Sequence, residues 1–127
     1  MSELAADLVK ATIRGLRRSI ILWLTNQEPR SGYGIMKEMK RLTGHDFHPG
    51  VIYPLLYELE RKGFIDGRWT TEKRRRIKYY STTEKGRELL DRMRKLFEMP
   101  IREALKDLLG EVATTPSKKE NARDTYP

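Results

Sequence analysis

The chain has 127 residues, of which 35% are charged. Its net charge is +8, and it contains no cysteine. This length suits one domain, and the missing cysteines exclude disulfide frameworks, thiolate zinc sites and cysteine nucleophiles. The longest apolar run, residues 20–24, is far shorter than the roughly 20 residues that cross a bilayer, so we expect a cytoplasmic protein without a membrane partner.

The positive charge is concentrated in one segment. Residues 61–80 hold eight basic and two acidic side chains and carry +6 of the total, whereas residues 84–111 hold seven of each sign. A basic excess confined to one place indicates a polyanionic partner.

The first part of the sequence has the spacing of two helices. Apolar side chains recur at helical intervals over residues 4–24 and predict the first helix. Ser31 can cap a second helix that ends at Gly44. The residues expected to be buried on this second helix are Ile35, Met36, Met39 and Leu42.

A third helix is predicted from about Gly50 or Val51 to Gly63, because apolar residues between them recur at helical spacing. Pro54 lies inside this segment. A proline fits only the first turn without loss of a hydrogen bond, so the helix is expected to begin close to it.

Beyond Gly63 the apolar period changes to two, which is typical of strands. We expect a two-stranded ribbon over residues 64–80, joined by a polar connection at residues 71–75, with the basic cluster at its tip and on its return strand.

The last helix can begin at either of two caps, Ser81 or Thr83, and its apolar spacing continues to Gly110. Pro100 is expected to kink or split this helix near residues 98–99. Residues 111–127 have almost nothing to bury and are predicted to be disordered.

Three helices, a hairpin and a further helix is the element order of a winged helix-turn-helix module. Several motifs in one order and spacing over about residues 16–90 make the chain similar to the PadR family of transcriptional regulators. They are Ile21-Leu22-x-Leu24, Ser31-Gly32-Tyr33-Gly34-Ile35, Pro49-Gly50-Val51-Ile52-Tyr53-Pro54, Leu59-Glu60-x-x-Gly63-Phe64-Ile65, Arg76-x-Lys78-Tyr79-Tyr80 and Thr83-Glu84-Lys85-Gly86-Arg87.

The resemblance implies a mainly α fold with a small β-hairpin, in which a winged helix-turn-helix carries N- and C-terminal dimerisation helices. Residues 1–83 would form the DNA-binding domain with its N-terminal helix, residues 84–110 the C-terminal dimerisation helix, and residues 111–127 a tail. It implies no cofactor.

The hairpin tip is the strongest candidate for DNA contact. Like charges at a tip repel one another, and an opposing polyanion relieves the repulsion. The candidate phosphate contacts are Lys73, Arg74, Arg75, Arg76 and Lys78. The alternative is a solvated loop.

The third helix cannot bind DNA by bulk charge, because the net charge of residues 31–60 is −1. The N-terminal residues of a recognition helix can still contact base edges while helix N-termini face phosphates. The candidates are His48, Gly50, Val51 and Tyr53 on the third helix, with Ser31 and Tyr33 at the start of the second. For Tyr33 and Tyr53 the alternative is a half-buried core tyrosine.

The first and last helices offer more apolar surface than so small a module can cover, so a homodimer is expected, as the resemblance also implies. The candidate interface residues are Leu4, Leu8, Leu90, Met93, Phe97, Ile101 and Leu105. A two-fold dimer would place its recognition helices about 34 Å apart on a palindromic operator.

The sequence therefore predicts a DNA-binding transcriptional regulator, a repressor, acting on double-stranded DNA as a homodimer. The alternative is a non-specific nucleoid-associated or RNA-binding architectural protein. No catalytic motif is present, and the spacing of His45, Asp46 and His48 lacks the second motif that a closed metal site needs. A small-molecule effector is left open.

Overall fold

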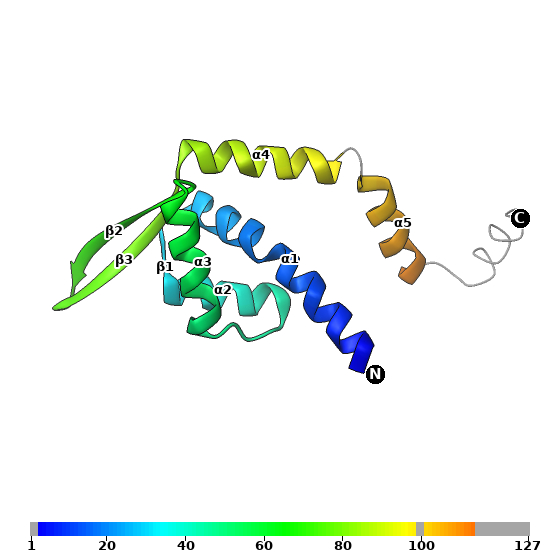
Figure 1. Cartoon of the computed structure of the whole chain (residues 1–127), viewed down its shortest axis with the longest axis horizontal. Helices are drawn as coiled ribbons and strands as arrows, with labels where there is room; N and C mark the ends of the chain where they lie inside the picture. The colour runs from blue at the N-terminus through cyan, green and yellow to red at the C-terminus, as the bar shows by residue number, and fades with distance from the viewer. Residues whose placement is uncertain (1–2, 99–100, 114–127) are drawn as a thin grey trace, which may run out of the picture. The chain divides into compact units, whose positions relative to one another are not determined.

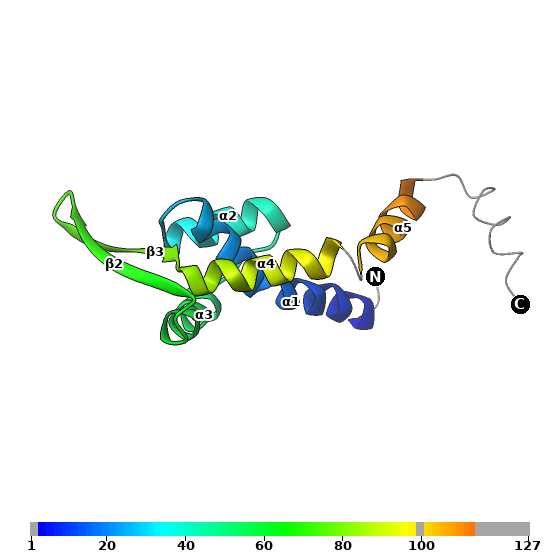
Figure 2. The same ribbon diagram turned by 90° about the horizontal axis from the view of Figure 1, so that it is seen from above.

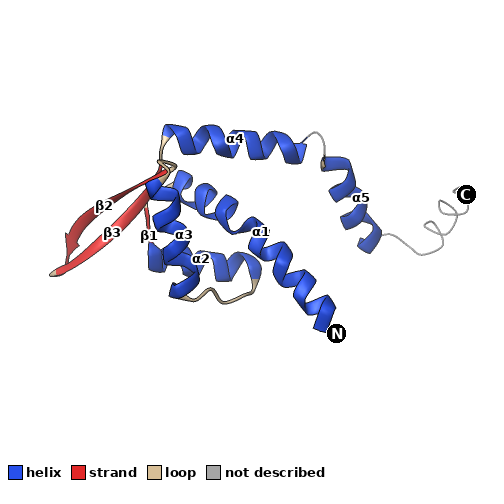
Figure 3. Ribbon diagram, in the orientation of Figure 1, coloured by secondary structure: helices blue, strands red, loops and turns tan. Residues whose placement is uncertain are grey.

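The computed structural model describes residues 3–98 and 101–113. The chain forms two compact units, Met1–Asp91 and Arg92–Pro127. The first unit contains α1 (Glu3–Gln27), β1 (Arg30–Ser31), α2 (Gly32–Thr43), α3 (Pro49–Arg61), β2 (Ile65–Glu72), β3 (Arg75–Thr82) and the first turns of α4 (Glu84–Glu98), and the second contains the rest of α4 and α5 (Arg102–Ala113) (Figures 1 and 3).

The core of the first unit lies where α1, α2 and α3 meet the sheet. Its fully buried side chains come from the second half of α1, from one stripe of α2 and α3, and from the inner face of β2 and β3. They include Ile21, Leu22, Leu24, Ile35, Met39, Ile52, Leu56, Ile65 and Tyr80. Leu42 was expected to be buried on α2, but it is 41% exposed because it lies in the last turn of that helix, beyond the stripe marked by Ile35 and Met39.

The helix boundaries differ from the predicted ones at three ends. α1 continues to Gln27, and α5 passes Gly110 to end at Ala113. α3 begins at Pro49, with His48 as its N-cap, so Pro54 lies in the second turn rather than in the first. The helix therefore lacks one N–H donor at Pro54, a cost that the four buried apolar residues of α3 offset.

The sheet has three antiparallel strands in the order β1-β3-β2, not the two expected. The two-residue strand β1 pairs Arg30 with Tyr80 and Ser31 with Tyr79, and so ties the start of α2 to the wing. A segment this short has no period to detect in a sequence. Figures 1 and 2 both show the β2–β3 hairpin extending away from the helices of this unit.

The hairpin connection is tighter than predicted. β2 and β3 pair from Ile65 with Thr82 up to Glu72 with Arg75, which leaves only Lys73 and Arg74 in the turn. Both have positive φ angles, 48° and 66°. This is the geometry of a type I′ turn, whose twist matches that of paired strands, but which normally takes asparagine and glycine.

Two threonines join α1 to the sheet inside the core. The Thr82 hydroxyl donates to the Leu22 carbonyl (2.8 Å) and lies 2.7 Å from the hydroxyl of Thr25, which can donate to it. Both side chains are buried. Their polar groups are therefore satisfied without water.

Of the two predicted caps of the last helix, Thr83 is the one used. Its hydroxyl accepts from the Gly86 N–H (3.1 Å) and donates to the Gly63 carbonyl (2.6 Å). A Cβ at Gly86 would lie 2.1 Å from the Phe64 carbonyl oxygen, so only glycine allows this approach. The motif Thr83–Gly86 thus fastens the start of α4 to the turn between α3 and β2.

The second unit carries α4 beyond Arg92 and α5. The predicted break near residues 98–99 agrees with the end of α4 at Glu98, while Pro100 lies outside the described residues, as do residues 114–127 of the predicted tail. None of the helices in the described ranges has the length and apolar character needed to traverse a bilayer.

Candidate nucleic-acid interface

The start of α2 presents a tyrosine to solvent. Ser31 is the N-cap, and its hydroxyl accepts a hydrogen bond from the Gly34 N–H at 3.0 Å, which fixes the first turn. Tyr33 follows in that turn with 70% of its surface exposed. Its side chain is therefore not part of the core and is free to contact a ligand.

α3 buries one face and exposes another. Ile52, Leu55, Leu56 and Leu59 face the core, while Gly50 and Tyr57 lie on the exposed face. Tyr53 stands between the two faces and is half-buried. Its hydroxyl lies against Gly32, where a Cβ would come within 2.6 Å of it, and its ring is 6.1 Å from that of Tyr57. Tyr53 therefore both packs against α2 and lines the outer surface.

His48 and Val51 lie on another side of α3. Both line a second hollow, together with Lys10, Arg14 and Arg17 of α1. His48 is exposed at the N-cap and makes no side-chain capping bond, and Val51 is half-buried. The structure thus separates these two candidates from Tyr53, which faces the hairpin.

The acidic side chains of α3 are neutralised within the protein. Glu58 pairs with Lys62 (3.2 Å) and with Arg18 of α1 (2.9 Å), and hydrogen bonds from Lys62 and then Arg18 lower the pKa of its carboxyl. Glu60 accepts from Lys78 of β3 at 2.8 Å. The net charge of −1 over residues 31–60 therefore overstates the repulsion that α3 would exert on a phosphate backbone.

The wing has cations of two kinds. Lys73, Arg74 and Arg75 are exposed at its tip and form no ion pair among the described residues. Arg76 stacks on the ring of Trp69, at 5.0 Å from its centroid. Lys78 is mostly buried and close to three aromatic rings, and its hydrogen bond to Glu60 raises the pKa of its ammonium group.

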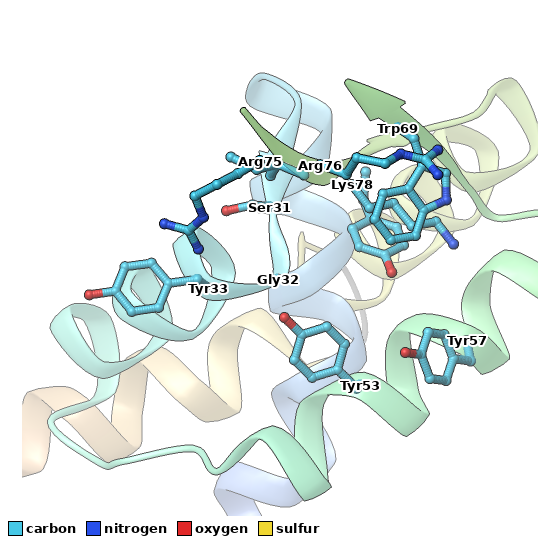
Figure 4. Close-up of a pocket in the computed structure, with 11 residues that line it drawn as sticks. Ser31, Gly32, Tyr33, Tyr53, Tyr57, Trp69, Arg75, Arg76 and Lys78 are labelled. Carbon is cyan, nitrogen blue, oxygen red and sulfur yellow. The ribbon is translucent and has the colours of Figure 1, made fainter. Parts of the chain in front are cut away.

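Some of these side chains surround a concave pocket of about 650 Å³. It is lined by the start of α2, the outer side of α3 and the two wing strands. Figure 4 shows the Tyr53 hydroxyl directed toward Gly32, with Trp69, Arg76 and Lys78 grouped on the hairpin side. Of the predicted contacts, the pocket brings together Ser31, Tyr33, Tyr53, Arg75, Arg76 and Lys78.

Two aromatic residues of this pocket were not predicted. Tyr57 is 53% exposed on α3 and Trp69 is 57% exposed on β2. Tyr57 follows Tyr53 by four residues, a helical spacing that could have placed both on one side. Trp69 pairs with Lys78 on the part of the hairpin that projects past the core, where an apolar strand residue is left exposed.

The predicted interface residues differ in how far the single chain buries them. Leu4 and Leu8 on α1 are exposed, as are Phe97 on α4 and, beyond the prediction, Leu108 and Leu109 on α5. Met93, Ile101 and Leu105 are half-exposed. Leu90 is only 6% exposed in the single chain, so its burial needs no second subunit.

No cluster of three or more metal-ligating side chains is found in the part of the chain that the structure describes. His45 and His48 instead line the hollow beside α1.

The helix pair α2–α3 followed by a β-hairpin defines a winged helix-turn-helix protein. Residues 21–92 match the model of the transcriptional regulator PadR-like family, and the chain belongs to that family. It is therefore a transcriptional regulator of the PadR-like family.

Solved structures support this assignment. The chain is similar to a PadR-like transcriptional regulator from Bacillus cereus, with a TM-score of 0.70 and 26% sequence identity; the match covers 78% of this chain and 96% of that one. It is also similar to a PadR-family transcriptional regulator from Eggerthella lenta, with a TM-score of 0.69 and 25% identity, over 89% of this chain and 95% of that one. A third similar structure is that of Bacillus subtilis PadR in complex with operator DNA, with a TM-score of 0.55 and 30% sequence identity over 60% of this chain and 45% of that one. No match was found among curated proteins.

Proposed function

We propose that the chain is a homodimeric, sequence-specific repressor that binds a palindromic operator through α3 and the β2–β3 wing. It would act by occupying promoter DNA, with no chemical step.

The observation that carries this proposal is the continuous concave surface formed by α2, α3 and the wing. A recognition helix in the major groove needs phosphate contacts on both sides to fix its register. Here the start of α2 and Arg75 of the wing line the same pocket as α3, with Arg75 extending toward Tyr33 (Figure 4), and the unpaired cations Lys73 and Arg74 stand next to Arg75 in the turn of the hairpin. The B. subtilis relative bound to operator DNA supports the same use of this module.

Within this surface the residue types suggest a division of labour. Gly50, Tyr53 and Tyr57 on α3 would contact base edges and sugars, with His48 and Val51 at the border of the contact. The wing tip and the first turn of α2 would hold phosphates, because they combine guanidinium groups with helix N-terminal amides.

The homodimer is proposed from apolar surface that a single chain leaves exposed. α1 exposes Leu4 and Leu8, and the second unit exposes Leu96, Phe97 and Leu108. Several exposed large apolar side chains on one helix are typical of association surfaces. A two-fold dimer requires two equivalent half-sites, and hence a palindromic operator.

The experiment is selection of bound fragments from random duplex DNA by the full chain. We expect enrichment of an inverted repeat with half-sites about one helical turn apart. Enrichment of a single unrepeated site would contradict the dimer. Uniform recovery of all sequences would favour a non-specific architectural protein and would overturn the proposal.

A further inference from the structure

The outermost polar link between the wing and the helices of the first unit is one ion pair. The ammonium group of Lys78 on β3 donates to the carboxylate of Glu60 in the last turn of α3 at 2.8 Å. Among the described residues, no side chain of residues 68–77 has a hydrogen bond or an ion pair with a helix. We call the pair of Glu60 and Lys78 the clasp, because the hairpin projects alone beyond it.

The clasp is shielded from water. The side chains of Glu60 and Lys78 are only 29% and 20% exposed. The rings of Tyr57, Trp69 and Tyr80 have their centroids 6.0, 5.8 and 5.2 Å from the ammonium group, and Figure 4 shows Lys78 grouped with Trp69. Opposite charges attract each other more strongly in such surroundings than in open solvent. The pair therefore holds α3 and β3 together more firmly than an exposed ion pair would.

One glycine makes room for the clasp. A Cβ at Gly67 of β2 would overlap the Cε atom of Lys78 and come within 2.7 Å of an Oε atom of Glu60. Both atoms are the ends of flexible side chains, so alanine at this position would leave the strand in place and push the two side chains apart. The clasp therefore depends on the absence of a side chain at residue 67.

The position of the clasp along the hairpin gives it leverage over the tip. Arg74 in the turn lies four residues from Lys78. That is about 13 Å of strand, so a swing of the hairpin by about 10° would move the tip by about 2 Å. Without the clasp the hairpin would sample several angles. DNA binding would then have to fix one of them, at a cost in affinity.

We propose that Glu60 and Lys78 are positioning residues, whose clasp holds the wing at one angle to α3 before DNA binds. This inference rests on the proposed function, in which α3 and the wing contact the same duplex. Transfer of the Lys78 ammonium to a phosphate would leave the Glu60 carboxylate unpaired beside a polyanion, which is costly. Lys73, Arg74 and Arg75 form no ion pair among the described residues and can contact phosphates without this cost.

The first experiment measures the affinity of the full chain for the duplex selected from random DNA, over a range of salt concentrations. Glu60→Gln removes an acid from the DNA-facing surface, so charge alone would raise the affinity. We expect the affinity to fall about fivefold or more, because the wing is no longer held in place. The slope of log K against log salt should stay the same, since no phosphate contact is lost. Gly67→Ala displaces the clasp without a change of charge and should have the same effect.

Two further variants isolate the pair. Glu58→Gln is the matched control, because it removes the same charge from the same helix but its partners are Arg18 and Lys62 rather than the wing. Its affinity for the selected duplex should not fall. The double variant Glu60→Gln/Lys78→Gln should lose no more affinity than either single variant, because each residue acts through the other.

The opposite results identify Lys78 as a phosphate contact. In that case Glu60→Gln would bind DNA more tightly, and Lys78→Gln would flatten the salt slope by about 0.9. Either result would overturn the proposal, as would losses that multiply in the double variant. If Glu60→Gln does not fold, Gly67→Ala decides between the two accounts, because its charge is unaltered.

The second experiment follows the wing without DNA. Time-resolved fluorescence anisotropy of Trp69 is recorded in a Trp23→Phe background, which leaves one tryptophan in the chain. We expect a larger amplitude of fast motion in Glu60→Gln and Gly67→Ala but not in Glu58→Gln, and unchanged motion in all three would overturn the proposal. If the unaltered chain selects no duplex, the proposed function alone is refuted, and increased motion of Trp69 still supports the clasp.

Discussion

The two residues in the turn of the hairpin have a backbone conformation that their side chains disfavour. Lys73 and Arg74 have φ angles of 48° and 66°, where residues other than glycine and asparagine lose roughly 1–2 kcal/mol each. Strain of this kind tends to persist at functional sites. Here it places two cations at the tip of the hairpin, just beyond the last pair of the ladder, Glu72 with Arg75.

Replacing Arg74 with glycine is therefore expected to have opposite effects on stability and binding. Glycine adopts positive φ without cost, so the free energy of unfolding should rise by about 1 kcal/mol. DNA affinity should fall, because one phosphate contact is lost. Urea unfolding and DNA titration of the same preparation measure both quantities, and a variant no more stable than the unaltered chain would show that the turn is unstrained.

The salt dependence of DNA binding tests the two kinds of wing cation. Arg74→Ala/Arg75→Ala should flatten the slope of log K against log salt by about 1.8 per subunit, because each phosphate contact contributes about −0.9. Lys78→Gln is the control: its ammonium is already paired with Glu60 at 2.8 Å, so the slope should change little. An unchanged slope in the folded double variant would mean that the wing tip does not touch DNA.

At the scale of elements, α1 and α3 are joined by an ion-pair bridge. Lys62, the C-cap residue of α3, and Arg18 of α1 both contact the carboxylate of Glu58, so the pKa of this group is lowered from its ordinary value of 4.5. A lowered carboxyl pKa stabilises the fold above pH 4.5, and this contribution is lost as the pH falls through the lowered value.

Glu58→Gln should consequently be less stable than the unaltered chain at neutral pH, and the difference should shrink on acidification below pH 4.5. The size of the effect is limited by the exposure of both partners. Thermal melts of both proteins from pH 7 to pH 3 measure it. A difference independent of pH would indicate that packing, rather than charge, accounts for the loss.

The main elements could be predicted because long periodic segments decide them. The core residues of α1 and α3 repeat over several turns, and the period-two pattern of β2 and β3 brackets the wing. β1 and the two-residue turn could not be predicted in this way. β1 exists only through its pairing with Tyr79 and Tyr80, and the turn contains neither glycine nor asparagine.

The candidate site was predictable as a set of residue types but not as an arrangement. Lys78 lies in the basic cluster of the sequence, yet its partner Glu60 is 18 residues away and comes close only when α3 packs on the sheet. Likewise His48 and Val51 lie on either side of Gly50 at the expected start of α3, but line the hollow beside α1. Such distinctions depend on tertiary contacts that no local pattern contains.

For the whole molecule, the assembly depends on surface that one chain leaves uncovered. Phe97 is 38% exposed on a segment whose charges balance. Phe97→Glu would place a carboxylate in the proposed subunit interface, where an unpaired buried charge costs several kcal/mol. We expect monomers by sedimentation. A folded variant that remains a dimer would exclude Phe97 from the interface.

The measurement that tests the central claim most directly is the ratio of two affinities of the full chain at physiological salt. One duplex carries the site selected from random DNA, and the other has the same composition in scrambled order. A repressor that reads bases through α3 should bind the selected duplex about 10³-fold more tightly or better. Equal affinities for the two duplexes would contradict sequence-specific recognition and leave only the electrostatic attraction of the wing.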